Sequence, residues 1–156
     1  MMNLLMDTYI SFQKIINSQP ACFSGIGLVV YNSLSFDRSS HSDLRPGYKA
    51  PDYHVGNDRF YRFLAEISDY HNTFHDGFHM VDETGTLRYI AQYFVPPVVA
   101  SLGPNQEHGV RLHSARCGST LKGVIFIAVI SSNFEVHFFK DGNAINLTDM
   151  EINYYV

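Results

Sequence analysis

Four residues between positions 71 and 79 carry side chains that bind metal ions in many proteins. They are His71, His75, Asp76 and His79. Two of the histidines are separated by one helical turn, and an aspartate with a third histidine completes a set that suits zinc. However, a helix is expected to end here, and a strand beginning at Gly77 would send His79 in another direction. We therefore expect no tight zinc site and interpret the group as polar residues at a helix end.

A second candidate site, for an anion, lies in the segment Gly109–Arg116. The segment opens with a glycine, and Arg111 follows two positions later. If a helix begins there, its free backbone N–H groups and its dipole favour a phosphate, and an arginine adds charge-assisted hydrogen bonds. An arginine near a helix start is also common as a solvated surface residue. The segment alone leaves both interpretations open.

The third candidate is a polar triplet, Ser131, Ser132 and Asn133, which follows the most apolar segment of the chain, residues 124–130. In open α/β sheets, ligands bind beyond the carboxyl ends of strands, where small polar residues can contact them. A polar hairpin turn accounts for the same three residues.

The composition is that of a folded domain. Of 156 residues, 46% are hydrophobic and 17% are charged, which suits one domain over residues 1–156. The net charge of −4 argues against duplex nucleic acid as a partner, because such binding relies on Lys and Arg neutralising phosphates. A small anionic ligand held by one or two cations is compatible with this charge.

Cysteine usage and the N-terminal segment bear on the compartment. Cys22 and Cys117 are the two cysteines and form no CxxC pair, so a disulfide framework is not expected. The N-terminal segment lacks a basic region and is interrupted by Asp7, which favours an amphipathic helix over a signal peptide. The longest apolar run, residues 124–130, is far shorter than the roughly 20 residues of a membrane span. We expect a cytoplasmic protein with no membrane partner.

The spacing of apolar residues predicts three helices. They are expected at about residues 3–18, from Asp58 as N-cap to Tyr70, and at residues 108–121. The polar segment 32–57, between the first expected strand and the second expected helix, is expected to be a long loop.

Strands are expected at residues 27–31, 77–81, 86–94, 124–130, 135–140 and 144–147. Hairpins join most of them, and the unalternating run 124–130 is typical of a central strand covered on both faces. The predicted fold class is α/β (α+β), with a mixed central β-sheet of about six to seven strands flanked by helices.

Taken in chain order, these segments resemble the diadenylate cyclase domain of the DisA N-terminal type. The stretch 76–85 is similar to the family's Asp-Gly-Ala strand opening and its hairpin. Residues 109–115 are similar to its Gly-Thr-Arg-His-Arg-Ala-Ala helix start. Residues 123–131 and 139–142 are similar to its central strand, its Ser-Glu segment and its Lys-Asp-Gly turn. The match extends, in order, over about residues 60–147.

The resemblance implies a ligand, a metal and a partner. Members of the family condense two ATP molecules into cyclic di-AMP across a face-to-face dimer, using a divalent metal. Asp76 would hold Mg²⁺ or Mn²⁺, Gly77 would allow close approach, Arg111 would bind phosphate, and residues 93–96 would line the base pocket. The implied partners are an adenine-type nucleotide, ATP or cyclic di-AMP, and a second copy of the chain. The implied nucleotide-binding set is Asp76, Gly77, Phe78, Arg111, His113 and Ser131.

This sequence departs from the family's pattern at five positions. The motif alanine is Phe78, the threonine is Val110, the histidine is Leu112, the second arginine is His113, and the glutamate is Ser132. Phosphoryl transfer depends on positioning and on cations that stabilise transition-state charge, and at least three supporting groups have changed. We therefore expect a degenerate, non-catalytic member that serves as a nucleotide-binding or sensor domain.

Two alternatives stay open. The first is an enzyme, either a divergent diadenylate cyclase in which Asp76 is catalytic or a metal-dependent hydrolase built on the histidine group. The second is a structural module with a dead pocket that contacts other proteins. If His113 replaces a permanent cation, anion binding should weaken with rising pH, because histidines gain charge only as pH falls toward about 6.5.

Overall fold

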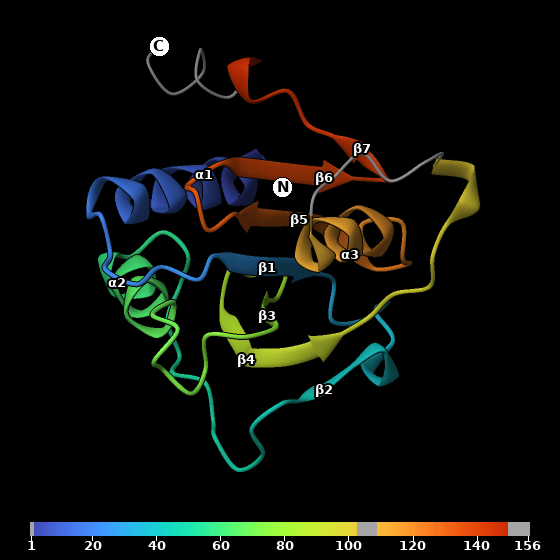
Figure 1. The fold of residues 1–156 in the computed structure, drawn as a ribbon. Helices are drawn as coiled ribbons and strands as arrows, with labels where there is room; N and C mark the ends of the chain where they lie inside the picture. The colour runs from blue at the N-terminus through green and yellow to red at the C-terminus, as the bar shows by residue number, and fades with distance from the viewer. Residues whose placement is uncertain (1, 103–108, 150–156) are drawn as a thin grey trace.

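The computed structural model describes residues 2–102 and 109–149, and their strands form one seven-stranded mixed sheet (Figure 1). The strand order is β2-β4-β3-β1-β5-β6-β7. Strands β1 and β3 are parallel, and every other neighbouring pair is antiparallel. The strands are β1 (Ile26–Tyr31), β2 (His41–Asp43), β3 (Phe78–Val81), β4 (Leu87–Phe94), β5 (Val124–Ile130), β6 (Val136–Lys140) and β7 (Asn143–Ala144).

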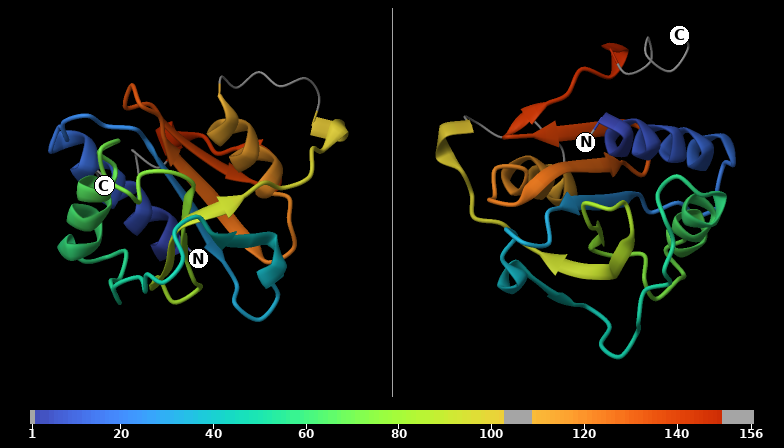
Figure 2. Two further views of the ribbon diagram at one scale, coloured as in Figure 1. Left: turned by 60° about the horizontal axis from the view of Figure 1, so that its bottom comes forward. Right: turned by 180° about the vertical axis from the view of Figure 1, so that it is seen from behind.

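The helices cover both faces of the sheet. Within the described residues, the α-helices are α1 (Met2–Asn17), α2 (Asp58–Ile67) and α3 (Val110–Gly118). Helices α1 and α2 lie together on one face and α3 lies on the other, as the left view of Figure 2 shows. The predicted fold class, a mixed sheet flanked by helices, is confirmed. None of the described helices is long and apolar enough to cross a membrane.

Strand β5 is interior, as its sequence predicted. It pairs with β1 on one side and with β6 on the other. Its side chains alternate between the two cores: Phe126, Ala128 and Ile130 pack in the core of α1 and α2, and Ile127 and Val129 pack in the core of α3. Because both faces are covered, the strand is apolar along its length without alternation.

The structure differs from the expected loop over residues 32–57. This segment contains the short edge strand β2, in which His41 pairs with Phe94 of β4. A 3-10 helix, Arg38–Ser40, precedes it, and Asp37 caps this helix by accepting the Ser39 N–H at 2.9 Å. A strand of three polar residues, two of them exposed, carries no apolar alternation, so the sequence gives no sign of it.

Several predicted boundaries are wrong by a few residues. The N-cap of α2 is Asn57 rather than Asp58, and the helix ends at Ile67. Helices α2 and α3 end for the same reason. The hydroxyls of Ser68 and Ser119 each donate to the carbonyl three residues earlier, and this bond competes with the backbone hydrogen bonds that would extend the helix. The last strand is limited to β7. The expected start of the third helix, residue 108, lies outside the described residues.

Candidate functional site

A cleft of about 310 Å³ opens where the start of β3, the end of β4 and the first turn of α3 meet. Four of the six residues of the predicted nucleotide-binding set line it: Asp76, Gly77, Phe78 and Arg111. They come from two segments more than 30 positions apart in the sequence, which the sheet and α3 bring together. The full lining is Leu44, Asp76, Gly77, Phe78, Gln92, Tyr93, Phe94, Val95, Val110, Arg111 and Ser114.

Gly77 fixes the position of Asp76 just before the start of β3. Its φ is +77°, a conformation that residues with side chains rarely adopt. A Cβ at this position would lie 2.4 Å from the carbonyl oxygen of Gln92 in β4. Glycine is therefore required twice over, by its backbone conformation and by the close approach of β4.

Asp76 supplies the carboxylate of the cleft. Its side chain is about half exposed, and Oδ1 lies 3.3 Å from Nδ1 of His75. It is the one carboxylate among the residues that line the cleft. Mg²⁺ and Mn²⁺ are oxygen-seeking ions, and Mg²⁺ is commonly held by one or two carboxylates together with the phosphates of a nucleotide. The donor set fits such a shared ion and does not form an all-protein metal cage.

Phe78 forms part of the floor of the cleft. Its side chain is buried, and its ring packs edge-on against Phe94 with centroids 5.3 Å apart. A Cβ on Gly27 of β1 would lie 2.6 Å from the Phe78 ring, so this glycine makes the space that the ring fills. The phenyl group that replaces the small residue of the family's motif is thus part of the α3 core.

Arg111 lies in the first turn of α3 with its guanidinium partly buried. Nη1 donates to the Ser24 carbonyl at 3.0 Å, and Nη2 donates to the His75 carbonyl at 3.4 Å. Burial lowers the pKa of Arg111 below its ordinary value, and the nearby Asp76 carboxylate opposes that shift. An arginine remains a cation in proteins, so the site carries a positive charge with little water around it.

A smaller hollow of about 190 Å³ lies on the other side of Arg111. The beginning of α3 forms one wall, and the loop that follows β5 forms another. The N-cap of α3 is Gly109, which has no side chain to bond the N–H groups of the first turn. Among the residues that the structure describes, no side chain caps this helix start, and such N–H groups suit an anion. The lining is Ser24, Gly109, Val110, Arg111, Leu112, Val129, Ser131 and Ser132.

Ser131 lines this hollow, but its hydroxyl is committed to the β5–β6 turn. It donates to Oδ1 of Asn133 and accepts the Glu135 N–H at 3.1 Å. The turn extends over residues 131–135, because the Ser131 N–H also donates to the Glu135 carbonyl at 2.8 Å. Ser131 shapes the hollow, and Ser132 beside it completes the wall.

His113 is the member of the predicted set that lines neither cavity. It lies two positions after Arg111 on α3, which turns it roughly 200° away around the helix axis. Its Nε2 lies 3.9 Å from Sγ of Cys117. The spacing of residues along an α-helix is by itself enough to predict that His113 and Arg111 point in different directions.

Three exposed apolar side chains form a rim around the cleft. Tyr93, Val95 and Val110 are 56%, 59% and 80% exposed. The first two lie in the segment that the family resemblance assigns to a base pocket, and Val110 stands where the family's motif has a threonine. Gln92, Ser114 and Leu44 of the lining were not foreseen, because their contribution depends on strand pairing and helix packing.

The histidine group of residues 71–79 does not assemble into a metal set. His79 is fully buried in β3, where its Nδ1 accepts the Ala91 N–H at 3.1 Å. Burial lowers the pKa of His79 to about 3, and the charge of Arg111 adds to that shift. His71 instead pairs with Asp69 at 2.9 Å. His75 lies beside Asp76, with Nδ1 3.3 Å from Oδ1, so the histidines of the group have different partners.

Comparison with known proteins places the fold in a class. No protein-family model matches the sequence, and no curated protein sequence matches it. A double mutant of DacA, a diadenylate cyclase from Staphylococcus aureus, superposes with a TM-score of 0.63 at 15% identity, covering 98% of this chain and 91% of that one. A hypothetical membrane-spanning protein from Bacillus cereus superposes with a TM-score of 0.64 at 19% identity, covering 89% of this chain and 61% of the other.

The chain therefore has a diadenylate-cyclase-like fold. At these identities the likeness concerns the fold, and this chain spans less than two thirds of the Bacillus cereus protein.

Proposed function

We propose that this domain binds an adenine-type nucleotide, ATP or cyclic di-AMP, in the cleft beside α3 and does not cyclise ATP. One observation carries the proposal: the cleft and the adjoining hollow meet at the partly buried guanidinium of Arg111, with the Asp76 carboxylate on one side and the N-terminus of α3, which has no side-chain cap, on the other. These are the groups that a metal-bound phosphate chain needs.

The phosphates would bind where the two cavities meet, at Arg111. Its guanidinium is already held by the carbonyls of Ser24 and His75, so little side-chain entropy is lost when it binds an anion. The first-turn N–H groups of α3 add dipoles of the same sign. Asp76 would share Mg²⁺ or Mn²⁺ with the phosphates, and the charge of the metal ion would offset the repulsion between the carboxylate and the phosphates.

The base would bind on the apolar side of the cleft. Tyr93 and Val95 flank the end of β4, and Val110 faces the same opening from α3. An exposed tyrosine beside two valines offers a stacking surface for a purine. The same exposed rim would be covered if two copies met face to face, which supports a homodimer as the bound form.

The absence of catalysis follows from the scarcity of cations. Among the described residues that line the two cavities, Arg111 is the one arginine or lysine. Val110 and Leu112 offer no hydroxyl or imidazole, and Ser132 offers no carboxylate at the family's positions. Cyclising two triphosphates requires several groups to neutralise transition-state charge, and a single cation with one shared metal falls short of that.

The proposal is tested by calorimetric titration with ATP and with cyclic di-AMP in the presence of Mg²⁺. Arg111→Ala removes charge-assisted hydrogen bonds worth about 1.5–3 kcal/mol, so the affinity should fall roughly 10- to 150-fold. Arg62→Ala is the charge-matched control, because Arg62 is an exposed residue of α2 on the opposite face of the sheet. The affinity of the Arg62→Ala variant for each nucleotide should equal that of the wild type. No binding of either nucleotide would leave the structural module as the function.

A second candidate, a divergent diadenylate cyclase, is favoured by one observation. Asp76 and Arg111, the family's metal residue and one of its phosphate residues, line the same cleft. Under this candidate, cyclic di-AMP accumulates when ATP is supplied with Mn²⁺, and Asp76→Ala abolishes the product.

A further inference from the structure

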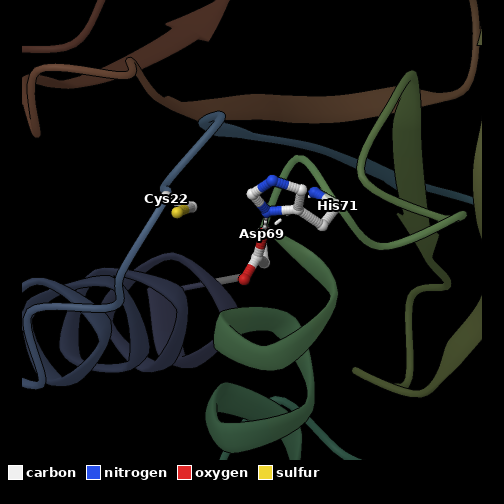
Figure 3. Close-up of side chains that lie close together, drawn as sticks. All are labelled: Cys22, Asp69 and His71. Carbon is white, nitrogen blue, oxygen red and sulfur yellow. Dashed lines mark hydrogen bonds and ion pairs between the residues drawn. The ribbon is translucent and has the colours of Figure 1, made fainter.

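A cluster of metal-binding side chains lies outside the cleft, between the loop that follows α1 and the loop that follows α2. It consists of Cys22, Asp69 and His71 (Figure 3). One sulfur, one carboxylate oxygen and one ring nitrogen all lie within 4.8 Å of one another. Within residues 2–102 and 109–149, no other group of three such ligands comes this close.

Backbone hydrogen bonds hold the two loops in register. The Tyr70 N–H donates to the Cys22 carbonyl at 3.0 Å, and the Ser24 N–H donates to the Ser68 carbonyl at 2.8 Å. Between them, Phe23 and Asp69 form an antiparallel β-bridge. The ligands therefore come from a paired backbone, although Cys22 and His71 are far apart in the sequence. Such a site loses little chain entropy when an ion binds.

The side chains are oriented by local contacts. Oδ1 of Asp69 accepts the His71 N–H at 2.8 Å and lies 2.9 Å from Nδ1 of the same histidine. The ring of Tyr70 packs against the His71 ring with centroids 4.7 Å apart, which limits its rotation. The thiol and the imidazole are both on exposed residues, so an ion can enter directly from solvent.

The ligand types select the ion. Thiolate and imidazole together suit zinc, and a carboxylate is its third common ligand, whereas Mg²⁺ takes oxygen ligands. Zinc ligands lie about 2.0–2.3 Å from the metal, so in a tetrahedron they are about 3.5 Å apart. The three ligand atoms lie within 4.8 Å of one another in the structure, so the exposed Cys22 and His71 side chains would have to adjust to reach that spacing.

We propose that Cys22, Asp69 and His71 bind one zinc ion per chain, with water in the fourth position. The ion clamps the loop after α1 to the loop after α2. Ser24, two residues from Cys22, carries the carbonyl that binds Arg111, so the clamp also fixes one wall of the smaller hollow. Zinc binding itself does not depend on the proposed nucleotide function.

The experiment uses the reduced protein of residues 1–156, stripped with a chelator and titrated with Zn²⁺, and with Co²⁺ as a spectroscopic probe. The wild type should bind one ion per chain, and Co²⁺ should give a thiolate-to-metal charge-transfer band. Cys22→Ser should abolish the band, and Asp69→Asn and His71→Gln should each weaken binding by about 100-fold or more, beyond the effect of typical outer-shell residues. His137→Gln on β6 is the matched histidine control and should leave both readouts unchanged.

A second readout uses the thiol itself. Cys22 is exposed and Cys117 is buried, so mild alkylation of the folded protein should modify Cys22. Zinc should slow this reaction in the wild type and should not slow it in His71→Gln. The proposal is overturned if the wild type binds no zinc, or if Cys22→Ser binds zinc as tightly as the wild type. Circular dichroism of each variant distinguishes loss of the site from loss of the fold.

Discussion

Arg111 shows how one side chain links the sheet to the cleft. Its guanidinium lies between the two cavities and bonds carbonyls of two loops that are distant in sequence. Space for it depends on Gly25, where a Cβ would lie 2.6 Å from Nη1. Removing water from a cation costs free energy, and an anion bound beside it recovers part of that cost.

Gly77 gives a prediction about stability. Gly77→Ala should lower the free energy of unfolding by about 2–4 kcal/mol, because the new Cβ meets both a positive φ and the Gln92 carbonyl. Gly47→Ala is the control, since Gly47 has φ +90° with nothing within 4 Å of the added Cβ. This control should lower the free energy of unfolding by only about 1 kcal/mol, because it carries the cost of a positive φ without a steric clash. Urea denaturation compares the two, and equal losses would mean that β4 does not approach Gly77 this closely.

The buried imidazole of His79 should make the stability of the fold depend on pH. The buried imidazole has a pKa of about 3, so the folded protein keeps it neutral while the unfolded chain protonates it below about pH 6.5. Stability from this residue is therefore complete above pH 6.5 and is lost as pH falls, by at most about 2 kcal/mol at pH 5. His79→Asn, which keeps an acceptor for the Ala91 N–H, should reduce the slope of unfolding free energy between pH 5 and 7. An unchanged slope would contradict a neutral buried His79.

At the scale of elements, the β3–β4 hairpin carries one wall of the cleft, and Asp82 shapes its turn. Oδ1 accepts the N–H groups of Thr84 and Thr86 at 2.9 and 3.2 Å, and Oδ2 accepts Nε of Arg88. Burial raises the pKa of Asp82, but the hydrogen bonds from Thr84 and Arg88 outweigh it and hold the pKa below its ordinary value. The turn is thus fastened by a single carboxylate.

Asp82→Asn should therefore lower the free energy of unfolding by about 1–3 kcal/mol at neutral pH, because an amide cannot accept all of these bonds. Asp52→Asn removes the other carboxylate near Arg88 and serves as the control. The Asp52 side chain is 87% exposed and 4.0 Å from Arg88, so its loss should cost less than about 0.5 kcal/mol. Thermal and urea unfolding measure both variants, and equal effects would show that the turn does not depend on Asp82.

The sequence predicted those elements whose pattern reflects burial. Strand β5 is apolar throughout because both of its faces are buried, and α2 has one apolar face because it buries one side against the sheet. The prediction failed for β2, whose three residues are held by pairing to β4, and for helix ends set by the hydroxyls of Ser68 and Ser119. Those features depend on a single contact rather than on a repeated pattern.

At the scale of the molecule, the sheet order decides which residues meet. Parallel pairing of β1 with β3 and the packing of α3 across the sheet bring Asp76 and Arg111 to one cleft. The resemblance to a known motif order anticipated this meeting, and local spacing could not. The cluster of Cys22, Asp69 and His71 was missed for the same reason, because the β-bridge between Phe23 and Asp69 that brings it together is encoded by no local pattern.

The central claim is that the cleft binds an adenine nucleotide without joining two of them. The most direct measurement incubates concentrated protein with ATP and Mn²⁺, separates bound from free nucleotide, and identifies both by chromatography. We expect bound ATP to be recovered unchanged, with no cyclic di-AMP, and Arg111→Ala to lose the bound fraction. Formation of cyclic di-AMP that disappears in Asp76→Ala, or the absence of any bound nucleotide, would contradict the account.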